Sequence, residues 1–146
     1  MSLPELSDQE ISEHFRGESR FGGCFSKGSI RRVKDGKFYI LNMDEPTGGG
    51  SHWILLSLMD PKVGIYFDSF AAPPPKSVLA CLKKFRSTSL RNLTQVQALN
   101  ASSCGWWTVY VAEQLMKGRP FNYIISDFND EDRGDNERKL RKYFGY

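Results

Sequence analysis

Cys104 lies where a cysteine could act as a nucleophile. It stands between the polar, small-residue segment 97–103 and the apolar run 106–112. Small polar residues before such a run and a glycine after it, here Gly118, mark the two ends of a helix. A cysteine in the first helical turn meets unpaired backbone N–H groups and the positive end of the helix dipole, which favour the thiolate that attacks carbonyl carbon. The alternative is that Cys104 is a small buried apolar residue, as most free cysteines are.

A cysteine nucleophile needs a base, and the chain has only two histidines, His14 and His52. His14 stands among charged residues and is expected on a solvated helix surface. His52 opens an apolar run, and Asp68 closes the next one. If the runs 52–58 and 63–68 form a hairpin, His52 and Asp68 are cross-strand neighbours, and the carboxylate can hold the imidazole in one tautomer. Taken alone, a histidine such as His52 is more often a structural residue than a base, and Asp68 could equally be a turn former.

Gln97 and Asn100 precede Cys104 by seven and four residues. A side-chain amide aimed at the same point as a backbone N–H at the start of the helix would form an oxyanion hole. We therefore take Gln97 as the candidate donor. The ordinary alternative is a glutamine at the end of a strand.

The remaining pattern predicts one α+β domain over residues 1–146. The length of 146 residues is enough for one domain with a real core. Ser7 and Glu10 form a capping-box pattern, and the helix that carries Cys104 is apolar nearly all round, which is typical of a helix packed inside a fold. Helices are expected over residues 7–16, from about 26, over 76–86, over 103–117 and at the charged C-terminus, and strands over 38–43, 52–58, 63–68 and 92–97, with 121–125 as a further candidate strand.

Composition and charge narrow the class of protein. There is no membrane-spanning run and no signal peptide, so we expect an intracellular, soluble protein with no membrane contact. The three cysteines include no CxxC pair, and Cys24 and Cys81 are interpreted as structural, so neither a disulfide framework nor a metal site is expected. The net charge is +3, and basic clusters at 27–37, 83–86 and 138–142 are either solvated faces or a weak binding surface for DNA.

Together these motifs resemble the adenain-like cysteine proteases. That family includes the adenovirus maturation protease and the capsid-maturation proteases of virophages and Maverick/Polinton elements, with the ubiquitin-like-protein proteases as more distant relatives. The resemblance covers roughly residues 20–120. Aspartate stands here for the glutamate of the adenovirus enzyme. The matching segments are Gly-Gly-Ser-His-Trp at 49–53, Tyr-Phe-Asp-Ser-Phe at 66–70, Val-Gln at 96–97, Asn100, and Cys-Gly at 104–105.

The resemblance implies a fold and a mechanism. The fold is a central mixed β-sheet packed against the buried helix that carries the nucleophile. Cys104 is then the nucleophile, His52 the base, Asp68 its orienter and Gln97 an oxyanion donor. Substrate contacts are expected at Trp53, Gly50, Ser51 and Gly105, with small residues such as glycine before the scissile bond.

The biological role that the resemblance implies is equally specific. The protein would be a cysteine endopeptidase that processes capsid or other virion precursor polypeptides. The implied location is the virion or the viral factory of the host cell. The chain is shorter than the adenovirus protease, and we expect it to act without the peptide and DNA cofactors of that enzyme. We also expect a monomer.

Three alternatives remain on sequence grounds. A deubiquitinase or deSUMOylase-like isopeptidase would use the same catalytic set on a folded ubiquitin-like partner. An effector acetyltransferase of the same clan would need an acyl-CoA site, for which the sequence gives no signal. A non-enzymatic nucleic-acid-binding virion protein would use the basic clusters and would not need His52, Asp68, Gln97 and Cys104 together.

Overall fold

The structure, a computed structural model, describes residues 3–43 and 52–146. Within these residues five strands form one mixed sheet in the order in which they follow along the chain. The outer pairs, β1 with β2 and β4 with β5, are parallel, whereas β3 runs antiparallel to both β2 and β4. The strands are β1 (Phe21–Ser26), β2 (Phe38–Asn42), β3 (Trp53–Ser57), β4 (Val63–Phe67) and β5 (Thr88–Arg91).

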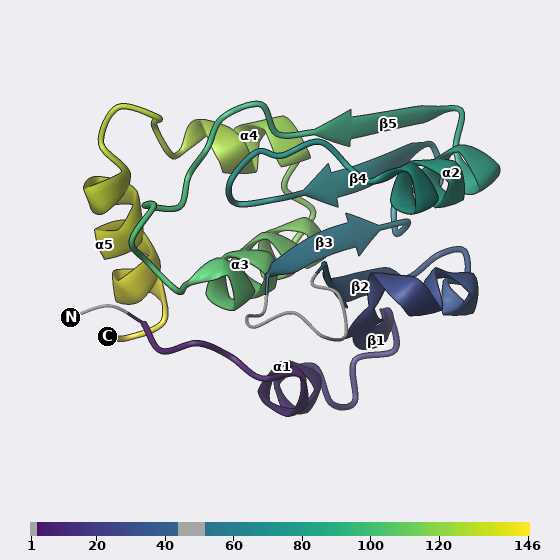
Figure 1. Cartoon of the computed structure of the whole chain (residues 1–146), viewed down its shortest axis with the longest axis horizontal. Coiled ribbons are helices and arrows are strands. Elements are labelled where there is room, and N and C mark those ends of the chain that lie inside the picture. Colours follow the sequence, from purple (N-terminus) through teal and green to yellow (C-terminus); the bar gives the residue numbers. More distant parts are fainter. Residues whose placement is uncertain (1–2, 44–51) are drawn as a thin grey trace.

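Helices cover both faces of this sheet (Figure 1). They are α1 (Asp8–His14), the 3-10 helix η1 (Lys27–Arg32), α2 (Lys76–Phe85), α3 (Cys104–Met116), α4 (Phe121–Ser126) and α5 (Arg133–Tyr143). On one face η1 and α2 enclose a small core, and on the other face α3 lies against β3 with α1, α4 and α5 around it. No helix of the described residues is long and apolar enough to cross a membrane.

Alternation along the strands divides the core between these two faces. In β2, Phe38 and Ile40 point to the α3 side, while Tyr39 and Leu41 point to the α2 side. Because both faces are covered, the central strands are apolar at nearly every position rather than at every second one. The side chains on both faces of β3 and β4 are buried, so a shift of one strand along the other would disrupt both cores. The register of this pair is therefore fixed, and with it the place where each strand ends.

Helix α3 forms the centre of the larger core. Nine of its thirteen residues are buried, among them Trp107 and Val111. Such a helix is held by packing on most of its circumference, so its first residue, Cys104, has a fixed position relative to β3.

The fold class expected from the sequence is confirmed: an α+β domain with a mixed sheet packed against the helix that carries Cys104. The hairpin, the helices at 76–86 and 103–117, and the capping box of Ser7 and Glu10 at the start of α1 are also confirmed. Strand β1 was not expected from the sequence, because it contains two adjacent glycines, Gly22 and Gly23, which are poor strand formers.

Two strand predictions are wrong. Residues 92–97 form an irregular segment in which Asn92 hydrogen-bonds with its side chain to Asp68 and Thr94, as asparagine does in place of ladder pairing. Residues 121–125 belong to α4, which begins directly after Pro120. The burial of Phe121 and Ile124, three residues apart, has the helical period rather than the strand period.

Candidate active site

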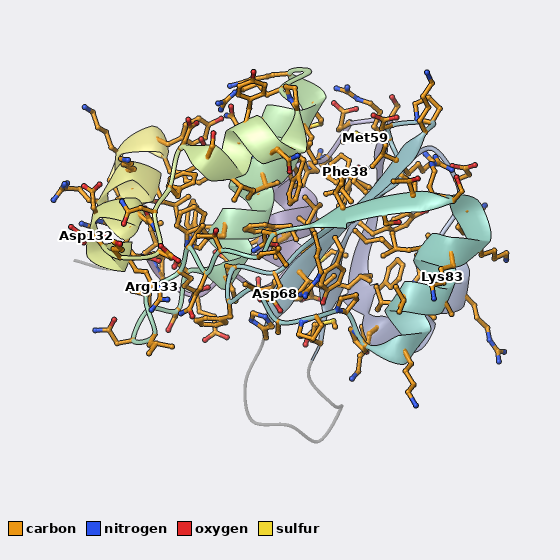
Figure 2. The ribbon with its side chains drawn as sticks, turned by 90° about the horizontal axis from the view of Figure 1, so that it is seen from above. Phe38, Met59, Asp68, Lys83, Asp132 and Arg133 are labelled. Atoms are coloured by element: carbon orange, nitrogen blue, oxygen red, sulfur yellow. The ribbon has the colours of Figure 1, made fainter. Side chains whose placement is uncertain are left out.

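The candidate site lies at one end of the sheet, where β3 begins, β4 ends and α3 begins. In Figure 2, Asp68 lies between α2, marked by Lys83, and the start of α5, marked by Asp132 and Arg133; Met59, in the turn after β3, lies at the opposite end. Three segments that are far apart in the sequence therefore meet at this end.

His52 and Asp68 are brought together as the hairpin predicted. His52 directly precedes β3, and its Nε2 donates to Oδ1 of Asp68 at 2.9 Å. Leu55 pairs with Phe67, and continuing that register sets Asp68 opposite Ile54, so the contact with His52 is the diagonal one across the hairpin.

Asp68 is held firmly for this task. Its side chain is 4% exposed, and its Oδ1 also accepts the backbone N–H of Phe70 at 2.8 Å. The ring of Phe70 lies 5.3 Å from that of His52, centroid to centroid, and limits its rotation. The side chain of Asn92 forms two hydrogen bonds with the backbone of Asp68. Its Oδ1 accepts the Asp68 N–H at 3.1 Å, and its Nδ2 donates to the Asp68 carbonyl at 2.6 Å.

His52 also interacts with Cys104. Burial alone lowers the pKa of the imidazole, but the hydrogen bonds and the charges of Asp68 and Cys104 outweigh that effect and raise the pKa of His52 to about 10. With Nε2 bound to a carboxylate, the other ring nitrogen remains for proton exchange with a second group. Cys104, 5% exposed, is the first residue of α3, where the sequence predicted it.

The other two cysteines have different surroundings. Burial raises the pKa of the Cys24 thiol to about 12, with Asp8 adding to the effect. Burial also raises the pKa of Cys81, against a smaller opposing contribution from Lys84. No histidine contributes to either shift, and the interpretation of both residues as structural stays a prediction.

Gln97 is fully buried and held at both ends of its amide. Its Oε1 accepts the hydroxyl of Ser69 at 2.6 Å, and its Nε2 donates to the carbonyl of Ala101 at 2.7 Å. The carbonyl of Ala101 can only accept, so this orientation of the amide is the one that satisfies all groups. An amide nitrogen carries two hydrogens, and one of them is left for a further acceptor.

Trp53 and Gly105 pack together beside the site, under the N-terminal segment. The Trp53 indole N–H donates to the carbonyl of Leu6 at 3.0 Å, and the side chain is 3% exposed. A Cβ on Gly105 would come within 3.1 Å of Leu6 and 3.2 Å of Trp53, so only glycine fits there without a shift. The N-terminal segment thus packs over the indole through Leu6, and the expected substrate contact of Trp53 stays a prediction.

Two other expectations concern Gly50 and Ser51, which lie outside the described residues. His14 lies away from the site and pairs with Glu113 of α3, Nε2 to Oε2, at 2.7 Å. Among residues 3–43 and 52–146 no group of three or more metal-binding side chains is arranged to hold an ion.

Three residues of the site, Ser69, Phe70 and Asn92, were not expected from the sequence. Ser69 and Phe70 follow Asp68 directly in the sequence, so we could expect them near it. The hydrogen bonds of Ser69 to Gln97 and of Phe70 to Asp68 could not be predicted from the sequence. No sequence pattern pointed to Asn92. In a single sequence, an asparagine that binds backbone groups in the interior looks the same as an asparagine in a turn.

Comparison with known proteins finds relatives only at the level of structure. No protein-family model and no curated protein sequence matches this chain. A crystal structure of ASFV pS273R protease matches with a TM-score of 0.58 and 18% identity, over 91% of this chain and 63% of that chain. A second structure of that protease covers 70% of this chain and 43% of its own, at a TM-score of 0.49 and 20% identity.

The Xanthomonas campestris effector XopD, solved bound to ubiquitin, matches with a TM-score of 0.43 and 14% identity, over 97% of this chain and 92% of its own. The chain thus spans less than two thirds of the length of either pS273R structure. The likeness to pS273R, at a TM-score of 0.58, establishes that this chain shares the fold of that protease.

Proposed function

We propose that this protein is a cysteine endopeptidase with Cys104 as nucleophile, His52 as base and Asp68 as the group that orients it. The observation that carries the proposal is the contact of His52 with both Asp68 and Cys104. The three side chains come from three different elements. A histidine that hydrogen-bonds a buried carboxylate through one nitrogen and a thiol through the other is the arrangement that activates a cysteine.

The reaction would follow from these contacts. His52 takes the proton of the Cys104 thiol, the sulfur bonds to the substrate carbonyl carbon, and the C=O π pair moves to oxygen. That pair then re-forms the C=O bond as the C–N bond breaks, and the imidazolium of His52 gives its proton to the leaving amine. Water, deprotonated by His52, then attacks the thioester and releases the acid and the thiol. Throughout, Asp68 holds the ring and stabilises its charged form.

The proposed oxyanion donors are the backbone N–H of Cys104 and the second hydrogen of the Gln97 amide. Gln97 cannot turn away, because Ser69 and Ala101 hold its two amide atoms. A donor that is fixed before the reaction stabilises the developing charge without reorganisation.

The proposed substrate is a polypeptide with small residues, such as glycine, before the cut, and the biological substrates are virion structural precursors. The fold shared with ASFV pS273R protease supports a polypeptide substrate. We further propose that it acts as a monomer in the virion or viral factory, with the basic clusters as a weak DNA-binding surface.

The decisive experiment is cleavage of a peptide library by the purified protein and by Cys104→Ala, His52→Ala and His14→Ala. Wild type and His14→Ala should cleave after small residues, while the other two variants should be inactive. Thermal unfolding of Cys104→Ala should stay within about 1 kcal/mol of wild type. Cleavage by Cys104→Ala, or equal losses for both histidine variants, would refute the assignment. Hydrolysis of a ubiquitin C-terminal amide, in place of the peptides, would indicate the isopeptidase alternative.

A further inference from the structure

A buried side chain of α5 forms hydrogen bonds with both ends of the segment between Gln97 and Cys104. Glu137 is 6% exposed and accepts three hydrogen bonds. Its Oε2 accepts the backbone N–H of Ala98 at 3.1 Å, and its Oε1 accepts the hydroxyl of Ser103 at 2.6 Å. The third donor is the indole N–H of Trp107, at 3.1 Å from Oε2. The carboxylate of Glu137 therefore links both ends of the segment 98–103 to each other and to Trp107 in the first turn of α3.

The neighbouring residue on α5 extends the grip to the other side of Gln97. Asn136 is fully buried, and its Nδ2 donates to the carbonyl of Val96 at 3.2 Å. Asn136 and Glu137 thus bind the peptide groups directly before and after Gln97. Figure 1 shows the chain between β5 and α3 passing alongside α5 before it enters α3.

These hydrogen bonds bear on the proposed oxyanion site, because both of its donors lie next to residues that Glu137 holds. Gln97 and Cys104 are adjacent to Ala98 and Ser103, the residues that Glu137 holds, and the side chain of Gln97 already binds Ala101 within the same segment. A carboxylate that binds both Ala98 and Ser103 therefore limits how far the two proposed oxyanion donors can move relative to each other. A shift of about 1 Å in such donors can cost about a hundredfold in rate.

We propose that Glu137 is a positioning residue that sets the oxyanion site by clamping Ala98 to Ser103. This rests on the proposed function, since it assigns a task within that site. A buried carboxylate is costly to leave without hydrogen-bond donors, and Glu137 has three of them.

The test uses Glu137→Ala and Glu137→Gln, with Leu140→Ala as control. In glutamine the Oε1 accepts the two N–H groups and the amide donates to the Ser103 hydroxyl, so the clamp is retained without its charge. Leu140 lies fully buried on the same helix and makes no polar contact through its side chain, so its truncation lowers stability without releasing the segment.

The main readout is the affinity of a peptide aldehyde that ends in glycine. The thiol adds to the aldehyde: the S–C bond forms, the C=O π bond breaks, and the oxygen takes up the thiol proton within the oxyanion site. Alkylation by iodoacetamide needs no such site and reports the thiol alone. We expect Glu137→Ala to lose about tenfold or more in aldehyde affinity and in kcat, with KM and the alkylation rate within about threefold of wild type.

Glu137→Gln should recover aldehyde affinity to within about threefold of wild type, and Leu140→Ala should retain it at temperatures where the variant is folded. Unchanged affinity in Glu137→Ala, or an equal loss in Leu140→Ala, would overturn the proposal. Hydrogen exchange of the Ala98 amide gives a readout independent of activity, and Glu137→Ala should accelerate it while Glu137→Gln should not. If wild type neither cleaves peptides nor binds the aldehyde, the proposed function fails, whereas unaccelerated exchange in Glu137→Ala contradicts the clamp itself.

Discussion

His52 carries its proton more tightly in the fold than in water, since Asp68 and Cys104 outweigh the effect of burial and raise its pKa from 6.5 to about 10. A raised pKa in the folded state means that the unfolded chain releases the proton first as pH increases. The resulting stabilisation is fully present below pH 6.5 and disappears as pH rises toward about 10. The same interaction that prepares the site for chemistry therefore makes its stability depend on pH.

We expect the stability advantage of wild type over His52→Gln to shrink steadily between pH 6.5 and about 10, because glutamine does not titrate. Urea unfolding at a series of pH values measures it for both proteins. His14→Gln is the matched control: it removes the other histidine, away from Asp68, and should leave the decrease in place. A constant difference across this range would contradict the contacts assigned to His52.

Gln97 offers a second test at the scale of one residue. If its amide binds an oxygen that becomes negative only during attack, Gln97→Ala should lower kcat by about a hundred- to a thousandfold and change KM by less than about fivefold. Gln95 is an unsuitable control, because its Nε2 donates to the Gln97 carbonyl at 3.0 Å. Asn100→Ala, an exposed residue of the same segment, should retain activity. A rise in KM alone for Gln97→Ala would show that Gln97 binds the ground state instead.

At the scale of elements, the start of α3 depends on close packing with the N-terminal segment. A Cβ at Gly105 would press on Leu6 and Trp53 at 3.1 and 3.2 Å. We expect Gly105→Ala to lower the free energy of unfolding by about 1–3 kcal/mol, which is the usual cost of overpacking. Denaturant unfolding measures this. Gly134→Ala on α5 is the control, since its nearest neighbour is a side-chain oxygen of Asp132 at 3.5 Å. Equal stability of Gly105→Ala and wild type would show that the N-terminal segment yields easily.

The elements that the sequence predicts best are those whose pattern is local. The helix that carries Cys104, the capping box at Ser7 and the hairpin that brings His52 to Asp68 each follow from spacing and turn residues within a short stretch. The contact of His52 with Asp68 was predictable because a hairpin fixes its own register.

What the sequence could not supply is long-range contact. The segment 92–97 carries strand-forming residues, yet Ser69 accepts the backbone N–H groups of Val96 and Gln97 and keeps them out of the sheet. Leu6 over Trp53 and Glu137 on Ala98 join residues 47 and 39 positions apart. No periodicity within one element records such a pairing, because burial of a polar group is decided by the partner that meets it.

At the scale of the molecule, folding gives three identical thiols three different environments. Cys24 lies on β1, Cys81 on α2 beneath the smaller core, and Cys104 beside His52 at the end of the sheet. With a pKa of about 12, the Cys24 thiol is ionised in about one molecule in 100,000 at pH 7, against about three in a hundred for an unperturbed cysteine. Burial raises the pKa of Cys81 as well.

We therefore expect iodoacetamide at pH 7 to modify Cys104 in the folded protein at least about a hundredfold faster than Cys24, and faster than Cys81, because only the thiolate reacts. The side chain of His52, which interacts with Cys104, is 25% exposed. Mass spectrometry of tryptic peptides over time gives the three rates. In urea the three rates should converge, since the differences arise from the fold, and folded Cys104→Ala should take up almost no label. Faster labelling of Cys24 than of Cys104 in the folded chain would contradict the assignment of Cys104 as the nucleophile.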